Sequence, residues 1–255
     1  MKILLTVAYV GTNYFGYQLQ GEAPTVALML NKAARAVFGF DCKITGCSRT
    51  DSGVHAIGYR VTVESADENN KITVPVDKIP IAMNTALPSD ISVTDATEVP
   101  DSFHPRYSVM KKRYVYKIRA SKLRDPFLHK RVLEYGREID KDAIEKMSIA
   151  AEHYIGKHDF SAFMASGSQI EDATRTVHES YITVNGDIIE FRVCADGFLY
   201  NMVRIMVGTL LDVAKGKIKA EDIPCIIESL DRKKAGFTAP PDGLYLERVF
   251  YPFDN

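Results

Sequence analysis

The segment that decides the fold is Tyr181-Ile-Thr-Val-Asn-Gly-Asp-Ile-Ile-Glu-Phe-Arg-Val193, in the second half of the chain. Two runs rich in β-branched and aromatic residues flank Asn185-Gly186. Both residues of this dipeptide tolerate a positive φ, so it suits the two-residue turn of an antiparallel hairpin. Around the hairpin, the patterns predict strands at residues 113–120 and 244–251, and helices at 141–155, 198–215 and 222–230. The second half is therefore predicted to run β-α-β-β-α-β.

The first half has the same predicted order. Strands are expected at residues 2–10, 43–49, 59–64 and 91–99, and helices at 25–38 and 77–86. Thr25 is a suitable N-cap for the first helix, and Gly39 a suitable C-terminal stop. Two such units predict an α+β fold with two ferredoxin-like, RNA-recognition-motif-like halves, residues 1–107 and 108–255. Their antiparallel sheets would flank a central cleft.

Composition narrows the class of protein. The chain is 46% apolar and 25% charged, as is usual for a globular protein. The N-terminal stretch lacks the pattern of a signal peptide. The most apolar window, residues 198–213, contains Arg204 and Asp212, so a buried helix is favoured over a membrane span. A cytoplasmic protein is expected. The four cysteines and the histidines show no metal-binding spacing, so neither a metal nor a disulfide is expected.

Charge is unevenly distributed. The formal net charge is −1, yet residues 111–137 carry a local charge of +8. One interpretation is a stripe that faces nucleic-acid phosphates; the other is a solvated strand and loop whose charges prevent edge-to-edge aggregation. Composition leaves both open. The basic residues are Lys111, Lys112, Arg113, Lys117, Arg119, Lys122, Arg124, Lys130, Arg131 and Arg137.

The candidate for chemistry is the segment Gly46-Cys-Ser-Arg-Thr-Asp-Ser-Gly-Val-His-Ala56, with Asp51 at the apex of a polar turn. Arg49 precedes Asp51 by two residues. In an extended segment this spacing places both side chains on one face, where a guanidinium can hold the carboxylate ionised and oriented. Taken alone, an Asp-Ser-Gly sequence after a strand is usually only a turn.

Arg-Thr-Asp-x-Gly-Val-His resembles the active-site motif of the tRNA pseudouridine synthase A family. Similar motifs follow in the family's order along nearly the whole chain, and together they are far more specific than any one alone. These are Tyr9-x-Gly-x-x-Tyr-x-Gly-Tyr-Gln-x-Gln20, Asn84-x-Ala-Leu-Pro88, Phe103-His-x-Arg106, Lys112-Arg-Tyr-x-Tyr116, Asn201-Met-Val-Arg-x-x-Val-Gly208 and Thr238-Ala-Pro-Pro-x-Gly-Leu-Tyr-Leu246.

The resemblance implies that Asp51 is the essential catalytic residue and that Arg49 and Arg204 serve the same site. It also implies substrate contacts, which we assign to Tyr114, Tyr116, Leu244 and Arg113, with the Tyr114 ring stacking on a flipped uracil. Each has a structural alternative. Tyr114 and Tyr116 share one face of a strand, where aromatics are commonly core. Arg204, in an apolar helix, requires an acid or a phosphate, and a purely structural ion pair would also satisfy it.

The implied reaction breaks the bond between ribose C1′ and uracil N1, turns the base, and joins C5 to C1′. It is redox-neutral and implies neither cofactor nor metal. The resemblance further implies uridines 38, 39 and 40 of the tRNA anticodon stem-loop as targets, and a homodimer. Four departures from the family pattern remove no charged catalytic group but weaken the assignment of the target: Ser48, Ser52, Val10 and Tyr17.

Two alternatives from other classes remain. One is a non-catalytic RNA-binding protein on the same fold, whose tRNA affinity would not depend on Asp51. The other is a ferredoxin-like small-molecule sensor or metabolic enzyme, which has no need for the +8 segment. The presence of Arg49, Asp51, Tyr114 and Arg204 favours the enzyme over the first, and salt-dependent tRNA binding would exclude the second.

Overall fold

The computed structural model describes residues 1–167 and 170–254, and the chain divides into two compact units. Unit 1 comprises Met1–Met110 and Tyr245–Asn255, and unit 2 comprises Lys111–Leu244. The observed boundary falls three residues after the expected one. The expected second half also included the last strand, which joins unit 1 because β10 (Leu244–Phe250) pairs in parallel with β3 (His55–Ser65).

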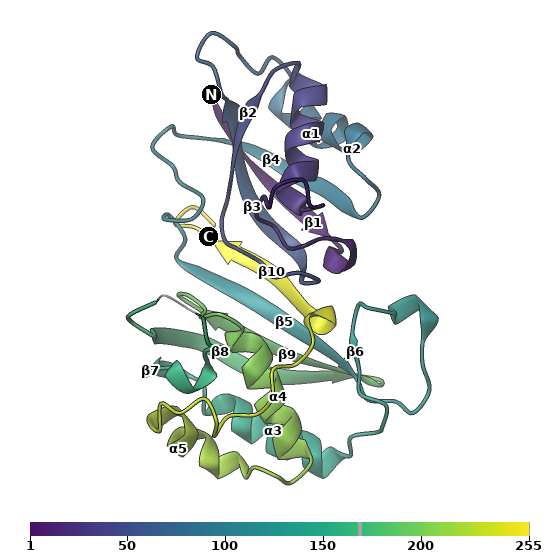
Figure 1. Ribbon diagram of the computed structural model, residues 1–255, viewed down its shortest axis with the longest axis vertical. Coiled ribbons are helices and arrows are strands. Elements are labelled where there is room, and N and C mark those ends of the chain that lie inside the picture. The colour runs from purple at the N-terminus through teal and green to yellow at the C-terminus, as the bar shows by residue number, and fades with distance from the viewer. Residues whose placement is uncertain (168–169, 255) are drawn as a thin grey trace. The chain divides into compact units, whose positions relative to one another are not determined.

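Unit 1 confirms the predicted β-α-β-β-α-β order (Figure 1). Its central strand β1 (Lys2–Tyr9) lies between β3 and β4 (Ile91–Val99) and is antiparallel to both. Strand β2 (Cys42–Gly46) pairs with the C-terminal part of β3, while β10 pairs with its first two residues. Helices α1 (Val26–Phe38) and α2 (Ile79–Ala86) pack against each other on one side of this sheet.

Local signals explain the helices of unit 1. The Thr25 hydroxyl accepts a hydrogen bond from the backbone N–H of Leu28 at 3.3 Å, as expected of an N-cap. Gly39 ends α1 in the left-handed region, with φ 81°. The second helix starts later than the predicted residue 77. A short 3₁₀ turn, Val76–Lys78, precedes it, and Pro80 lies in its first turn.

The strands on either side of Asp51 are displaced from the prediction. Strand β2 ends at Gly46 rather than at residue 49, and β3 begins at His55 rather than at residue 59. Gly46 marks the point of departure: a Cβ there would lie 2.3 Å from the Tyr59 hydroxyl, so only glycine allows this approach. Residues 47–54 therefore form an irregular segment rather than the end of a strand.

Unit 2 also confirms the predicted α+β class. Its antiparallel sheet has the order β5-β9-β8-β7. The predicted hairpin is present, with Asn185 paired to Ile188 and Gly186 at φ 61°. The very short strands β6 and β7 were not predicted, because segments of that length carry no periodicity. The elements are β5 (Lys111–Arg119), β6 (Leu133–Glu134), α3 (Lys141–Glu152), β7 (Gly156–Asp159), β8 (Thr174–Asn185), β9 (Ile188–Ala195), α4 (Met202–Ala214) and α5 (Ile223–Glu228).

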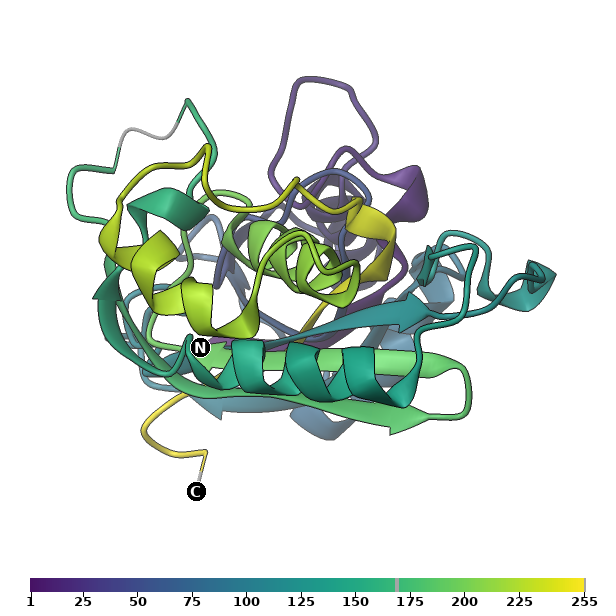
Figure 2. The ribbon, with the colours of Figure 1, turned by 90° about the horizontal axis from the view of Figure 1, so that it is seen from below.

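The helices of unit 2 are shorter than predicted. Helix α4 starts at Met202 rather than at residue 198 because Asn201 has φ 60°, which an α-helix cannot contain. Helix α5 ends at Glu228, shortly before Leu230 at φ 55°. Helices α3 and α4 pack against each other, and α3 lies along β8 (Figure 2). No helix among residues 1–167 and 170–254 is long and apolar enough to cross a membrane.

Short 3₁₀ helices complete the chain. They are Gly11–Asn13, Val76–Lys78, Pro126–Leu128, Ser161–Phe163, Ala220–Asp222 and Pro241–Gly243.

Candidate active site

The Asp51 loop, residues 47–54, presents its side chains alternately. Arg49 is exposed, Thr50 is 8% exposed, and Asp51 is half-buried. The Thr50 and Tyr9 hydroxyls are hydrogen-bonded to each other at 2.8 Å, which fixes Thr50 on the inner side. Arg49 and Asp51, on either side of Thr50, are both more exposed than Thr50.

The predicted pairing of Arg49 with Asp51 stays a prediction, although the two side chains differ in exposure. The prediction assumed an extended segment through both residues, whereas β2 ends at Gly46 and residues 47–54 are irregular. Arg49 is left exposed to solvent, where a phosphate can reach it.

The backbone of the Asp51 loop is fixed by the first motif of the chain. The Tyr14 carbonyl accepts hydrogen bonds from Gly53 N at 3.3 Å and from the Ser52 hydroxyl at 3.2 Å. Tyr17 N donates to the Thr50 carbonyl at 3.2 Å. At Gly16, with φ 84°, a Cβ would lie only 2.5 Å from that carbonyl, so the contact requires glycine. The first motif and the Asp51 loop, which the sequence analysis treated as separate motifs, are therefore hydrogen-bonded to each other.

Tyr59 supports the loop from the sheet. Its hydroxyl donates to the Ser48 carbonyl and accepts from Ser48 N at 3.4 Å, and its ring stacks on Tyr17 with centroids 4.4 Å apart. Burial raises the pKa of Tyr59 well above its ordinary value, so the hydroxyl remains protonated and able to donate. Sequence reasoning missed this role, because Tyr59 appeared only as a strand residue.

His55 anchors the C-terminal end of the loop. It is fully buried, its Nδ1 accepts a hydrogen bond from Gly11 N at 2.9 Å, and its ring stacks on Tyr245 at 4.6 Å. The Asp51 loop is thus held at both ends and in the middle. The backbone that carries Asp51 is thereby fixed before any substrate arrives.

Arg204, in the first turn of α4, is the candidate cation of unit 2. Its Nε donates to the Ala239 carbonyl at 2.6 Å, and one terminal nitrogen donates to the Asn201 side-chain oxygen at 2.7 Å. These two acceptors fix the plane of a half-buried guanidinium. Asn201 was quoted only as part of a motif, and its role in aiming Arg204 was missed.

The aromatic residues of β5 differ from each other. Tyr116 is fully buried, and its hydroxyl donates to the Pro240 carbonyl at 2.7 Å. Burial raises the pKa of Tyr116, although the nearby Arg204 charge opposes the shift. Tyr116 therefore fits the core alternative. Tyr114 is 8% exposed and meets the ring of Phe198 edge-on at 4.9 Å.

Helix α4 and the segment leading to Leu244 are in close contact. The Arg204 carbonyl accepts from Ala239 N at 3.0 Å, and the Thr209 hydroxyl accepts from Gly236 N at 2.9 Å. At Gly208 a Cβ would lie 1.7 Å from the Phe237 carbonyl oxygen, so the approach requires glycine. Leu244, 6% exposed, follows this segment directly.

The basic residues of β5 face acids of the same unit. Arg113 donates to both carboxylate oxygens of Glu179, at 2.7 and 3.0 Å, so its guanidinium is engaged within the protein rather than presented to a substrate. Charges of β5 are thus paired within unit 2, which neither interpretation of the +8 segment included. Further ion pairs of β5 are Lys111–Glu179 at 3.8 Å, Lys117–Glu190 at 3.6 Å, Arg119–Glu134 at 3.3 Å and Arg119–Asp187 at 2.9 Å.

The predicted site residues are divided between the units. Arg49 and Asp51 belong to unit 1, and Arg113, Tyr114, Tyr116, Arg204 and Leu244 belong to unit 2. Among residues 1–167 and 170–254, no group of three or more His, Cys, Asp or Glu side chains is placed to hold a metal ion.

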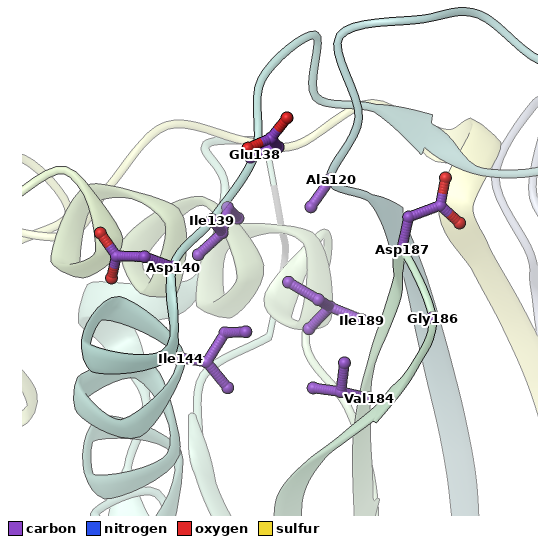
Figure 3. Close-up of a pocket in the computed structure, with 9 residues that line it drawn as sticks. All are labelled: Ala120, Glu138, Ile139, Asp140, Ile144, Val184, Gly186, Asp187 and Ile189. Carbon is purple, nitrogen blue, oxygen red and sulfur yellow. The ribbon is translucent and has the colours of Figure 1, made fainter.

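Unit 2 also contains a pocket of about 510 Å³ that none of the predicted site residues lines (Figure 3). Its lining combines five aliphatic side chains with three acids that are directed away from its centre. It offers no cation or converging donor to an RNA phosphate, so we do not assign substrate binding to it. The lining residues are Ala120, Glu138, Ile139, Asp140, Ile144, Val184, Gly186, Asp187 and Ile189.

Comparisons with known proteins agree with the motifs. A family model described as tRNA pseudouridine synthase matches residues 5–108 and 150–252. Proteins named tRNA pseudouridine synthase A are similar over 98% of this chain. Those of Caldicellulosiruptor saccharolyticus and Thermoanaerobacter sp. (strain X514) are 43% and 46% identical over 99% of their own length. That of Staphylococcus carnosus is 38% identical over 91% of its length.

Among solved structures, a Cbf5-Nop10-Gar1 complex aligns with a TM-score of 0.37 and 11% identity, over 95% of this chain and 57% of that one. We base no argument on this distant likeness.

Proposed function

The chain belongs to the tRNA pseudouridine synthase family, whose members isomerise uridine to pseudouridine in tRNA, and we propose that its own targets lie in the anticodon stem-loop. The targets are uridines 38, 39 and 40, and Asp51 is the catalytic carboxylate. The observation that carries this assignment is the Asp51 loop, which the first motif and Tyr59 hold in one conformation.

The reaction conserves atoms and electrons. The bond between C1′ and N1 breaks, the uracil turns, and a bond forms between C5 and C1′; C5 then loses its proton to solvent, while N1 gains one. An ionised carboxylate can start the process by attack as a nucleophile or by removal of a ribose proton. Both roles require Asp51 to be charged and fixed.

We assign Arg204 to the support of that charge. A half-buried guanidinium is costly unless it meets an anion, and Asn201 and Ala239 hold this one in a defined plane. In the proposal Arg204 stabilises the Asp51 carboxylate or the negative charge that develops during base rotation. Arg49, which is exposed, contacts the RNA backbone.

The remaining residues of unit 2 shape the place for the base. Tyr114 offers a ring for stacking, worth about 1–3 kcal/mol per base, which offsets part of the cost of extrusion from the stem-loop. Leu244 forms an apolar wall that keeps water from the intermediate. Tyr116 and Arg113 act indirectly, because Pro240 and Glu179 already engage their polar groups.

We also propose that two copies form a homodimer that binds one tRNA, and that the protein acts in the cytoplasm. Light scattering of the purified protein tests the dimer. A mass of 28.5 kDa at all concentrations would contradict it.

The target is tested by mapping. The protein is incubated with an unmodified tRNA transcript that carries uridine at positions 38, 39 and 40, and pseudouridine is located by chemical labelling and primer extension. We expect modification at these positions with the parent protein and none with Asp51→Ala. Modification elsewhere would refute the target, and RNA binding without any modification would favour a non-catalytic binding protein.

A further inference from the structure

The connection between β5 and β6, residues 121–132, displays two large apolar side chains to solvent. Phe127 is 86% exposed, the largest fraction among the large apolar side chains that the structure describes, and Leu123 is 77% exposed. Two large apolar side chains exposed on one short loop offer apolar surface that a partner can cover. We refer to residues 121–132 as the β5–β6 loop.

The β5–β6 loop is ordered at its tip. The Asp125 carboxylate accepts a hydrogen bond from Phe127 N at 2.9 Å and caps the 3₁₀ turn Pro126–Leu128. Arg131 N donates to the Leu128 carbonyl at 2.9 Å. The backbone that carries Phe127 is therefore held in a hydrogen-bonded turn, which lowers the entropic cost of a contact at this position.

The base of the β5–β6 loop is anchored to the sheet of unit 2. Val132 is buried, and Leu133 and Glu134 pair in parallel with Ile118 and Arg119. Arg119 also binds the Leu123 carbonyl and the Glu134 carboxylate. Both views show the loop extending away from the strands of its unit (Figures 1 and 2). The sheet of unit 2 thus anchors the base of the β5–β6 loop, and the rest of the loop extends beyond the strands.

The charge of the β5–β6 loop complements a polyanion. It contains four exposed basic residues and a single acid, Asp125, which is occupied as a cap. Two acids that follow the loop in sequence form ion pairs: Glu138 pairs with Lys122 of the loop, and Glu134 pairs with Arg119 of β5. Aromatic rings interleaved with cations are typical of surfaces that bind unpaired nucleotides. The basic residues are Lys122, Arg124, Lys130 and Arg131.

We propose that the β5–β6 loop is an RNA-contact element, in which Phe127 stacks on an unpaired base of the substrate tRNA and the neighbouring cations face its phosphates. The proposal rests on the proposed function for the identity of the RNA. The segments matched by the family model end at residue 108 and resume at 150, so the loop lies outside them. It adds a contact at a distance in sequence from Asp51 and Arg204.

The stacking part is tested with unmodified tRNA transcript and fluorescence anisotropy. We expect Phe127→Ala to weaken binding about tenfold, as loss of one stacked base does. Phe127→Tyr keeps the ring and should bind as the parent does, whereas Phe127→Leu, which keeps only apolar character, should resemble the alanine variant. Ile81→Ala, which truncates a 66% exposed apolar residue of unit 1, is the matched control and should leave the dissociation constant unchanged.

The phosphate part is tested by salt dependence. Arg124→Ala should reduce the slope of log K against log salt by about 0.7, the contribution of one phosphate on a single strand. Arg35→Ala is the control, since Arg35 is also exposed but binds Asp41 in unit 1. An unchanged slope for Arg124→Ala would remove the phosphate contact from the proposal.

The outcomes separate this inference from the proposed function. If Phe127→Ala binds tRNA as the parent does while the parent forms pseudouridine, the inference is overturned and the function stands. If the parent binds tRNA through Phe127 but forms no pseudouridine, the function fails and the inference stands. Sedimentation supplies a third outcome: if Phe127→Ala dissociates a parent dimer with no direct loss of RNA affinity per protomer, the loop is a protein interface and the inference is wrong.

Discussion

The Asp51 loop and the N-terminal turn of α4 each present one charged side chain, but they fix it by opposite means. In unit 1 the backbone is irregular, and hydroxyl and N–H groups of Tyr59 and Tyr17 hold the chain itself. In unit 2 the backbone is a regular helix, and the carbonyl of Ala239 and the side chain of Asn201 hold the Arg204 guanidinium. A charge on a loop needs its backbone supported, whereas a charge on a helix needs only its side chain aimed.

This difference predicts different consequences of mutation. Loss of a supporting group in unit 1 should lower stability and activity together, because the loop conformation depends on it. Loss of an aiming group in unit 2 should lower activity with little effect on the fold, because the helix persists without it.

Among the residues that surround Asp51 in the proposed function, the largest effect is expected for Arg204→Met, which keeps most of the side-chain volume and removes the charge. Removal of one preorganised electrostatic group typically costs about 10²–10³ in kcat. We expect a loss of this size at saturating tRNA, with unfolding by urea little changed. Arg192→Met, which removes a cation paired with Glu190 in the same unit, is the control. Equal kcat values for Arg204→Met and the parent would show that the Arg204 charge does not contribute to catalysis.

A smaller effect is expected for Tyr59→Phe, which removes the hydroxyl beneath Ser48. Loss of a buried hydrogen-bonding group costs about 1–3 kcal/mol, so the free energy of unfolding in urea should fall by that amount. The kcat should fall as well, because the Asp51 loop loosens. Tyr181→Phe, at an exposed tyrosine of unit 2, should change neither. Reduced activity at full stability would show that Tyr59 does not act through the loop.

The smallest effect is expected for Asn201→Gly, which permits φ 60° but removes the acceptor for Arg204. A hydrogen bond to a charged group contributes about 1.5 kcal/mol at the low end, so kcat should fall about tenfold. Asn201→Ala should show the same loss of kcat and a further loss of stability of about 1 kcal/mol, from the left-handed backbone. If the glycine variant keeps the parent kcat, the side chain of Asn201 does not aim Arg204.

Short-range signals account for what the sequence predicted. Asn185-Gly186 specified the hairpin, and Thr25 and Gly39 specified the ends of α1, because each acts on its own few residues. Resemblance of spaced motifs then identified Asp51 and Arg204 as candidates, which no local rule selects.

Long-range pairing accounts for what was not predicted. Nothing within residues 244–251 indicates that β10 joins β3 of unit 1, and nothing near Arg113 shows that Glu179 lies across the sheet. The strand before Asp51 was predicted to continue to residue 49, but it ends at Gly46. Such errors arise where a side chain's partner is distant in sequence or where a strand stops early.

The measurement that tests the central claim most directly is tritium release from tRNA labelled at uracil C5, with the parent protein and Asp51→Asn compared under single-turnover conditions. The variant keeps the size of the side chain and removes its charge, and Asp95→Asn, at an exposed acid of β4, is the control. We predict release by the parent and the control, and none above background by Asp51→Asn at unchanged tRNA affinity. Release by Asp51→Asn at the parent's rate would contradict the role of Asp51 as the catalytic carboxylate.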